Sequence, residues 1–163
     1  MKQSGIGRSV KRLEDETFLL GQGNFIGDID LPLQSYGYIL RSSHPHAELL
    51  SIDISIALKS DGVLLVLTGE DVRGDKLGGI PCAQLQGDGG WLKGFRTHQP
   101  ILAIDKVRFV GEGIAMVVAE SLEQAKDAAE LIKISYEVKP FVIALDQAIN
   151  SDTPLVWPEA KNN

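Results

Sequence analysis

The segment spanning residues 108–137 constrains the fold most strongly, because it sets a glycine pair, an apolar run and a helical pattern in a fixed order. Gly111 and Gly113 come before the apolar run at 114–119. A dinucleotide-binding turn instead needs its glycines between a strand and the helix whose N-terminus receives the phosphate. The order therefore predicts a buried strand followed by a packing helix, and it argues against a nucleotide site.

The helix after this strand is expected to begin at Ser121, whose hydroxyl can cap it, with Gln124 three residues on in the capping-box arrangement. The apolar side chains that follow share one helical face: Leu122, Ala125, Ala128, Ala129 and Ile132. Residues 132–139 then alternate between apolar and polar, which predicts a half-buried strand.

Further strands are expected upstream, at 36–42, 47–55 and 63–68. The alternation in 47–55 places Leu50, Ile52 and Ile54 on one face. The run 63–68 is continuously apolar, which predicts a strand covered on both faces. Residues 100–113 also have a strand-like texture, with a turn at 105–106.

Short helices are expected at 55–62, closed by Gly62, and at 144–149, and Thr68 with Asp71 can start a helical turn. Residues 73–98 hold seven of the 17 glycines, which predicts a long loop of functional or partner-contacting character. The pattern as a whole indicates an α+β (mixed α/β) domain at 32–149, preceded by an extended arm at 1–31 and followed by an exit linker at 150–163.

Composition excludes several classes of protein. The 163 residues carry a net charge of −6 and no basic cluster interleaved with aromatic residues, which argues against nucleic-acid binding. No apolar run approaches the roughly 20 residues that span a bilayer, and the basic N-terminus lacks the apolar core of a secretory signal. The lone Cys82 excludes an internal disulfide. We therefore expect a cytoplasmic protein.

A second glycine cluster, at residues 21–27, follows the short apolar segment 18–20, as a nucleotide-binding loop follows a strand. An acidic stretch that contains a proline comes next, where a nucleotide site would need the start of a helix. Turn glycines are the simpler interpretation. The pair His44 and His46 could share a metal ion on one strand face, yet Pro45 interrupts a regular strand, and local hydrogen bonding is the alternative.

Three other candidates also have a structural alternative. Cys82 could be a nucleophile, but no base is adjacent to it. Glu112 and Asp105 could act as acid or base, or simply be solvated turn charges. Trp91 and Phe95 lie in the glycine-rich loop, where two large rings could dock against another surface or anchor the core. No catalytic, cofactor-binding or metal-ligating set emerges from these residues.

Several stretches taken together resemble one family. The opening "IGRSVKRLEDETFLLGQGNFIGDIDLP", then "LRSSHPHAELLSIDIS", "GVLLVLTGEDV", "PILAIDKVRFVGEGIAMVVAES", "QAKDAAELIKISYEVKP" and "PLVWPEAKNN" resemble, in the same order, the large subunit of bacterial molybdenum hydroxylases. That family includes the xanthine dehydrogenases, the aldehyde oxidases and the aerobic carbon monoxide dehydrogenases. The resembled region is the α/β-hammerhead domain near the start of that subunit.

The resemblance implies a division of labour in the parent enzyme. Molybdopterin, in its cytosine dinucleotide form, would be bound by later domains of the large subunit, and the 2Fe–2S clusters and FAD by separate small and medium subunits. The start at Met1 resembles this arrangement of separate chains, and the stop at Asn163 predicts a fragment or a split gene that is inactive alone. The enzyme would oxidise aldehydes, N-heterocycles or carbon monoxide with oxygen from water.

Within that scheme, the domain would pack on the molybdopterin domain and help to shape the substrate funnel. The segment "QPILA" resembles the part of the family that runs near the substrate channel, which makes Pro100, Ile101 and Leu102 candidate channel residues, with Trp91 and Phe95 from the preceding loop. Two alternatives remain open: a free-standing interaction module of the same fold without molybdenum, and a hydrolase built on Cys82 and a histidine.

Overall fold

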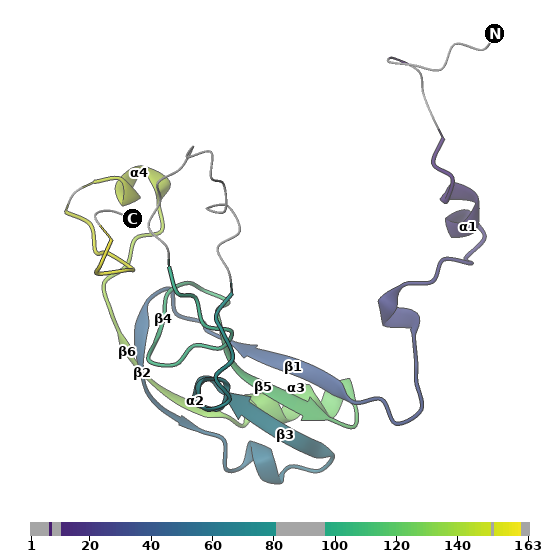
Figure 1. Ribbon diagram of the computed structural model, residues 1–163, viewed down its shortest axis with the longest axis horizontal. Coiled ribbons are helices and arrows are strands. Elements are labelled where there is room, and N and C mark those ends of the chain that lie inside the picture. The colour runs from purple at the N-terminus through teal and green to yellow at the C-terminus, as the bar shows by residue number, and fades with distance from the viewer. Residues whose placement is uncertain (1–6, 8–10, 81–96, 151, 161–163) are drawn as a thin grey trace. The chain divides into compact units, whose positions relative to one another are not determined.

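The computed structural model describes Gly7 and residues 11–80, 97–150 and 152–160. The chain divides into two units, Met1–Gln34 and Ser35–Asn163, each of which has its own elements (Figure 1). The site positions predicted at Cys82, Trp91 and Phe95 lie outside the described residues.

The first unit contains a helix, α1 (Asp15–Leu19), and a 3-10 turn, η1 (Ile26–Asp28). The Phe18 and Phe25 rings stack with their centroids 5.6 Å apart, and Gly23 fits against them because a Cβ there would lie 2.9 Å from the Phe18 ring. Neither element holds a buried residue.

Two antiparallel three-stranded sheets organise the second unit. Sheet A has the order β1 (Tyr36–Arg41), β5 (Gly113–Ala119), β3 (Val63–Thr68). Sheet B has the order β4 (Lys106–Val107), β2 (Ala47–Asp53), β6 (Lys133–Val138). The mixture of sheets and helices confirms the predicted fold class.

Helix α3 (Leu122–Glu130) packs against β1 and β5. The Ser121 hydroxyl accepts a hydrogen bond from the Gln124 N–H at 3.2 Å, as the sequence predicts for the start of this helix. The expected small-residue face is buried, with Ala125, Ala128 and Ala129 in one core cluster with Ala115, Val117 and Ala119 of β5. Small side chains on both elements let the helix lie close to the strand.

A second core cluster, formed by Ala47, Ala103, Val107 and Ile114, joins sheet B to the end of β5. Ile52 and Ile134 are partly buried and pack against both clusters, so the two sheets share a continuous interior. The largest fully buried side chains are Val107, Ile114 and Val117, each of which contributes about 1.5–3 kcal/mol.

The remaining elements are short. The 3-10 turn η2 (Ala57–Lys59) precedes Gly62, whose φ of 72° suits a glycine. Helix α2 (Gly69–Gly74) starts at Thr68, whose N–H and hydroxyl both donate to Asp71 Oδ2 at 2.7 Å, as expected. Helix α4 (Leu145–Ala148) lies inside the predicted range 144–149.

Three predictions about strands are wrong. Strand β3 is at the edge of sheet A rather than covered on both faces, and Leu64 and Leu65 are 56% and 43% exposed. The register of β2 shifts between Leu49 and Ser51, so that the bulge leaves Leu50 60% exposed and Leu49 packs inward instead. Within residues 100–113, only β4 and the first residue of β5 are strand.

Candidate functional site

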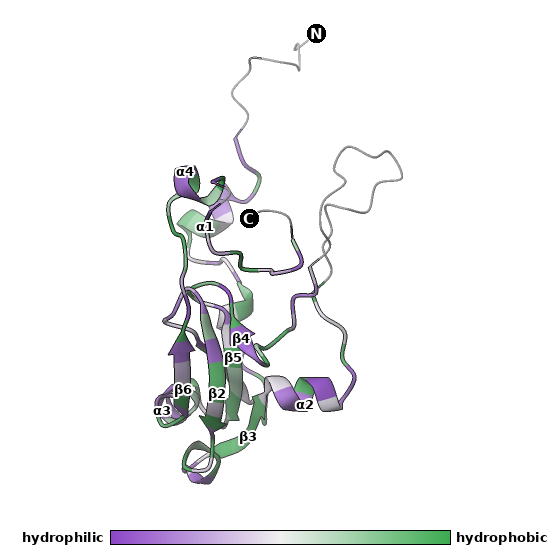
Figure 2. Ribbon diagram, turned by 90° about the vertical axis from the view of Figure 1, so that its left-hand side faces the viewer, coloured by the Kyte–Doolittle hydropathy of each residue, from purple (hydrophilic) through white to green (hydrophobic). Residues whose placement is uncertain are grey.

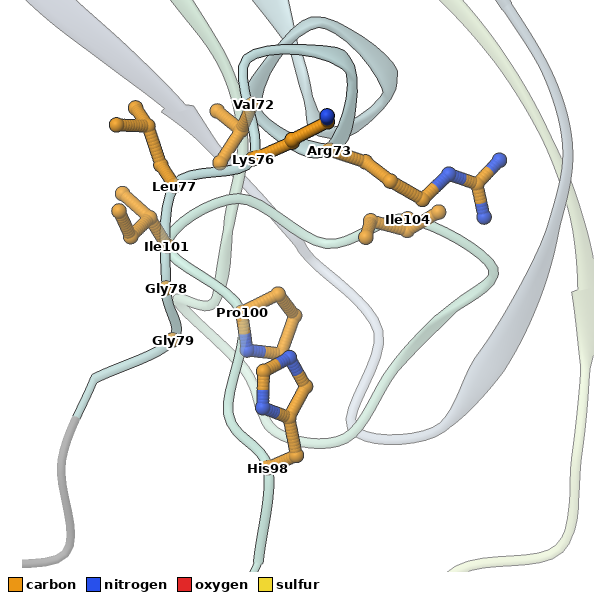
Figure 3. A pocket seen from close by; sticks show the side chains of 10 residues that line it. All are labelled: Val72, Arg73, Lys76, Leu77, Gly78, Gly79, His98, Pro100, Ile101 and Ile104. Atoms are coloured by element: carbon orange, nitrogen blue, oxygen red, sulfur yellow. The ribbon is translucent and has the colours of Figure 1, made fainter.

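A pocket of about 170 Å³ lies where α2 meets the segment at residues 98–104. Figure 3 shows the lining residues Val72, Arg73, Lys76, Leu77, Gly78, Gly79, His98, Pro100, Ile101 and Ile104. This set contains two of the predicted channel residues, Pro100 and Ile101.

The end of α2 forms one wall of the pocket. The Leu77 N–H donates to the Val72 carbonyl at 3.2 Å and the Lys76 N–H to the Arg73 carbonyl at 3.1 Å, which is the Schellman pattern of a helix end. Lys76 holds the left-handed position of this motif, with φ at 56°, where glycine is the usual residue. The reversal brings Leu77 beside Val72 as an apolar surface.

The opposite wall comes from the segment after the glycine-rich loop. The Ile80 N–H donates to the Gln99 carbonyl at 2.8 Å, so residues 78–80 lie beside residues 98–100. Gly79 permits this approach, because a Cβ there would lie 2.5 Å from the Gln99 carbonyl oxygen. Ile101 is 46% exposed at the pocket.

Leu102 is placed differently from the other two channel candidates. It is only 4% exposed and does not line the pocket, and its side chain lies beside Gly113. Within the segment, Pro100 and Ile101 therefore face the pocket, and Leu102 anchors the segment that carries them.

The pocket provides binding surface rather than acid–base chemistry. Its lining is mainly apolar, with the cations Arg73 and Lys76 and the imidazole of His98, and it includes no carboxylate. Arg73 already forms an ion pair with Glu70 on the same helix. Such a pocket can seat a small apolar group with an anionic or polar tip.

A buried polar cluster lies just before the start of β5. Glu112 is 3% exposed, which contradicts its interpretation as a solvated turn charge, whereas Asp105 is exposed. Glu112 Oε2 accepts a hydrogen bond from the Arg108 N–H at 2.5 Å. Burial raises the pKa of Glu112, and the Arg108 N–H and guanidinium charge partly offset that rise.

The backbone around Glu112 is tied to β1. The Ser42 N–H donates to the Glu112 carbonyl at 2.8 Å, and Arg41 Nη1 donates to the Gly111 carbonyl at 2.8 Å. Gly111 has a φ of 93°, which turns the chain so that the carboxylate enters the interior. Beyond this turn, the Arg108 guanidinium lies 4.0 Å from the centre of the Trp157 ring, a cation–π contact with the C-terminal segment. The positive φ could not be read from the sequence.

The two histidines of the metal hypothesis have separate local partners. The His44 ring meets the Tyr136 ring edge-on, with centroids 4.6 Å apart, and His46 Nδ1 donates to the Pro140 carbonyl at 2.9 Å. In the described ranges of the chain, no three His, Cys, Asp or Glu side chains gather as metal ligands would. Among those same residues, no helix has the length and apolar character that crossing a bilayer requires.

Comparison with known proteins gives the chain its relatives. Residues 20–140 match the family model "Aldehyde oxidase and xanthine dehydrogenase, a/b hammerhead domain". The chain is 37% identical over 161 residues to the carbon monoxide dehydrogenase large chain of Afipia carboxidovorans, covering 99% of this chain and 18% of the relative. It is 38% identical over 132 residues to the nicotine 6-hydroxylase large subunit of Paenarthrobacter nicotinovorans, covering 81% of this chain and 15% of that subunit.

Solved structures agree with this assignment. The aldehyde oxidoreductase of Desulfovibrio gigas superposes with a TM-score of 0.80 at 27% identity, over 92% of this chain and 16% of the other. A Cu,Mo carbon monoxide dehydrogenase superposes with a TM-score of 0.75 at 36% identity, over 93% of this chain and 18% of the other. The chain thus spans about a fifth of the length of the relatives that it matches. It belongs to the aldehyde oxidase and xanthine dehydrogenase family, whose a/b hammerhead domain it represents.

Proposed function

We propose that this hammerhead domain is a structural part of a molybdenum hydroxylase large subunit, in which it packs on the molybdopterin domain and helps to shape the substrate funnel. The observation that carries the proposal is that 99% of the chain matches a carbon monoxide dehydrogenase large chain at 37% identity. The names of its relatives cover aldehydes, N-heterocycles and carbon monoxide, and the enzyme would act on a substrate of one of these classes.

The residues that the structure describes include no set suited to hold a cofactor. Molybdenum, iron–sulfur clusters and flavin need sulfur, imidazole, carboxylate or phosphate-binding groups in a set. Over the ranges that the structure describes, no such cluster of potential metal ligands is found. On the resemblance to the family, we propose that molybdopterin, as the cytosine dinucleotide, is bound by the rest of a large subunit, and 2Fe–2S and FAD by partner subunits in the cytoplasm.

The funnel role belongs to the segment at 100–102. Pro100 and Ile101 line a mainly apolar pocket, and Leu102 is buried beneath them, which gives the segment a fixed position. Trp91 and Phe95 remain candidates for the same wall. We retain the proposed division into an arm at 1–31, a hammerhead domain at 32–149 and an exit linker at 150–163.

The proposal is tested by tagging the chain at its own gene in its native host and purifying the product. The expected product is a large polypeptide, or a complex, that contains molybdenum and pterin and oxidises a substrate of the classes above. A product of 163 residues without molybdenum, bound to unrelated proteins, would instead establish a free-standing interaction module and overturn the proposal.

The funnel assignment has its own test in the same preparation. Ile101→Trp should raise KM for a bulky substrate more than for a small one, because the wall of the funnel becomes narrower. Ile80→Trp is the matched control, since Ile80 is similarly exposed, at 49% compared with 46%, but does not line the pocket. Equal changes in KM for the two variants would show that Ile101 does not line the funnel.

A further inference from the structure

The two faces of sheet A differ in what covers them. Val117 of β5 pairs with Tyr38 of β1 and with Val66 of β3. Its side chain packs in the core cluster that contains the alanines of α3. Cross-strand partners share a face and neighbouring residues alternate, so the adjacent pairs point the other way. These pairs are Gly37 and Leu65 with Val118, and Ile39 and Leu67 with Met116.

The opposite face of sheet A, termed the open face, consists of Ile39, Leu65, Leu67, Met116 and Val118. None of these side chains belongs to, or packs on, either core cluster in the described structure. Leu65 is 43% exposed, and the other four are partly exposed. Helix α3 packs on the side of sheet A that carries Val117, which is opposite to this face.

The five side chains of the open face are all apolar, unlike those of the outer face of sheet B, and the charged Arg41 follows only at its end, where its guanidinium donates to the Gly111 carbonyl. Along β6, the side chains that alternate with the buried ones are Lys133, Ser135 and Glu137, all exposed. Figure 2 shows this contrast, with β5 and β3 coloured as hydrophobic while β2 and β6 alternate. An antiparallel sheet with one face in water normally shows the second pattern. The first pattern is typical of a sheet that another layer covers.

The open face continues into the segment assigned to the funnel. A Cβ on Gly113 would lie 3.1 Å from Ile39 Cγ2 and 3.3 Å from Leu102 Cδ2, so Leu102 lies at the end of this face. A layer that covers the open face would therefore also lie next to Pro100 and Ile101. This continuity selects the occupant, because a funnel wall must stand beside the catalytic part of the enzyme.

We propose that the open face docks the remaining part of a large-subunit polypeptide, through an apolar and uncharged surface of that polypeptide. This inference rests on the proposed function. The relatives support the occupant, because the matched region is only 18% of the carbon monoxide dehydrogenase large chain, so most of that polypeptide lies outside the region matched here. The apolar side chains of the open face favour an uncharged partner surface, since buried charges without a counterion are costly.

The experiment uses the protein purified from its native host, in a Cys82→Ser background, with a single new cysteine. Leu65→Cys probes the open face, and Leu50→Cys on sheet B is the matched control, because the two leucines are 43% and 60% exposed in the structure of this chain. The thiol at position 65 should react with a maleimide about tenfold more slowly than the thiol at position 50, because reaction then requires local opening. Comparable rates at the two positions would overturn the proposal.

The occupant is identified by placing the photo-crosslinker p-benzoylphenylalanine at position 65 and mapping the crosslinked peptide by mass spectrometry. A crosslink to large-subunit sequence outside these 163 residues supports the proposal. A crosslink to a second copy of the chain, or to residues 11–34, overturns it. Molybdenum and pterin in the same sample test the proposed function separately. If the enzyme contains molybdenum but the thiol at position 65 reacts readily, the docking proposal is overturned and the proposed function stands.

Discussion

The backbone N–H of Arg108 donates to Glu112 Oε2 at 2.5 Å, while Oε1 of the same carboxylate is buried without a hydrogen-bond partner among the described residues. Arg108 Nε is also buried without a hydrogen-bond partner among the described residues. The carboxylate of Glu112 therefore has one oxygen, Oε2, stabilised by a hydrogen bond, and one oxygen, Oε1, removed from water without a partner among the described residues. It is consequently the group in the described structure whose protonation should couple most directly to folding.

The free energy of unfolding should decrease as pH rises, because of Glu112. Burial raises its pKa above the usual 4.5, so the folded state binds this proton more tightly than the unfolded state does. The resulting stabilisation is complete below about pH 4.5 and is lost as pH rises through the raised value. Glu112→Gln retains an acceptor for the Arg108 N–H and should flatten this decline in urea unfolding from pH 4.5 to 7.5. An unchanged slope in the variant would contradict the prediction.

Asp71 provides the comparison of opposite sign. Hydrogen bonds from Thr68 lower its pKa, so its contribution is present above the usual value of 3.8 and is lost as pH falls through the lowered one. Asp71→Asn should therefore reduce the loss of stability below pH 4 without changing the slope that Glu112 causes. The same urea titrations, extended to acid, measure both effects.

Removing the Glu112 carboxylate should destabilise the fold more than neutralising it. Glu112→Ala leaves the Arg108 N–H without its acceptor and opens a space beneath the turn. A buried donor without a partner costs about 1–3 kcal/mol. Glu112→Ala should accordingly unfold at lower urea concentration than Glu112→Gln, and equal midpoints would show that the hydrogen bond contributes little.

Lys76→Gly should stabilise the protein by about 1 kcal/mol, because Lys76 holds the left-handed end position of α2 with φ at 56°. Lys126→Gly is the control, since Lys126 is exposed within α3, where glycine costs about 1 kcal/mol. Thermal unfolding should shift in opposite directions for the two variants. A loss of stability in both would mean that the backbone at position 76 is not left-handed in solution.

The two glycines at the ends of α2 should respond oppositely to alanine. A Cβ at Gly69 would lie 2.3 Å from the Ala103 carbonyl oxygen, whereas a Cβ at Gly74 would meet nothing within 4 Å. Gly69→Ala should cost about 1–3 kcal/mol through overpacking. Gly74→Ala should stabilise by up to about 1 kcal/mol through helix propensity. Denaturant midpoints for the pair test whether α2 packs on the segment at 102–104.

Ser121→Ala should cost about 1 kcal/mol, because the Ser121 hydroxyl accepts from the Gln124 N–H at the start of α3. Ser121→Asp supplies another acceptor and should recover most of this loss. Helical circular dichroism with urea unfolding measures both variants. An aspartate variant as unstable as the alanine variant would argue against the cap.

Local patterns in the sequence predicted the elements whose causes are themselves local. The cap at Ser121, the small-residue face of α3, the capping box at Thr68 and the alternation in β6 all depend on residues within a few positions of one another. Six matching stretches in order also sufficed to identify the family, which the matched model over residues 20–140 confirms.

Tertiary contacts decided the rest, because they depend on partners distant in sequence. An apolar run reads the same whether its strand is central or at an edge, so only the pairing with β5 showed that β3 leaves Leu65 exposed. A bulge that no local residue signals turned Leu50 outward. Glu112 became a buried group only when β1 and the turn at Gly111 enclosed it. Local patterns along the chain were enough to predict most of the elements and the family. Which side chains are enclosed and which face stays open depends on the fold, since burial arises only when distant segments meet.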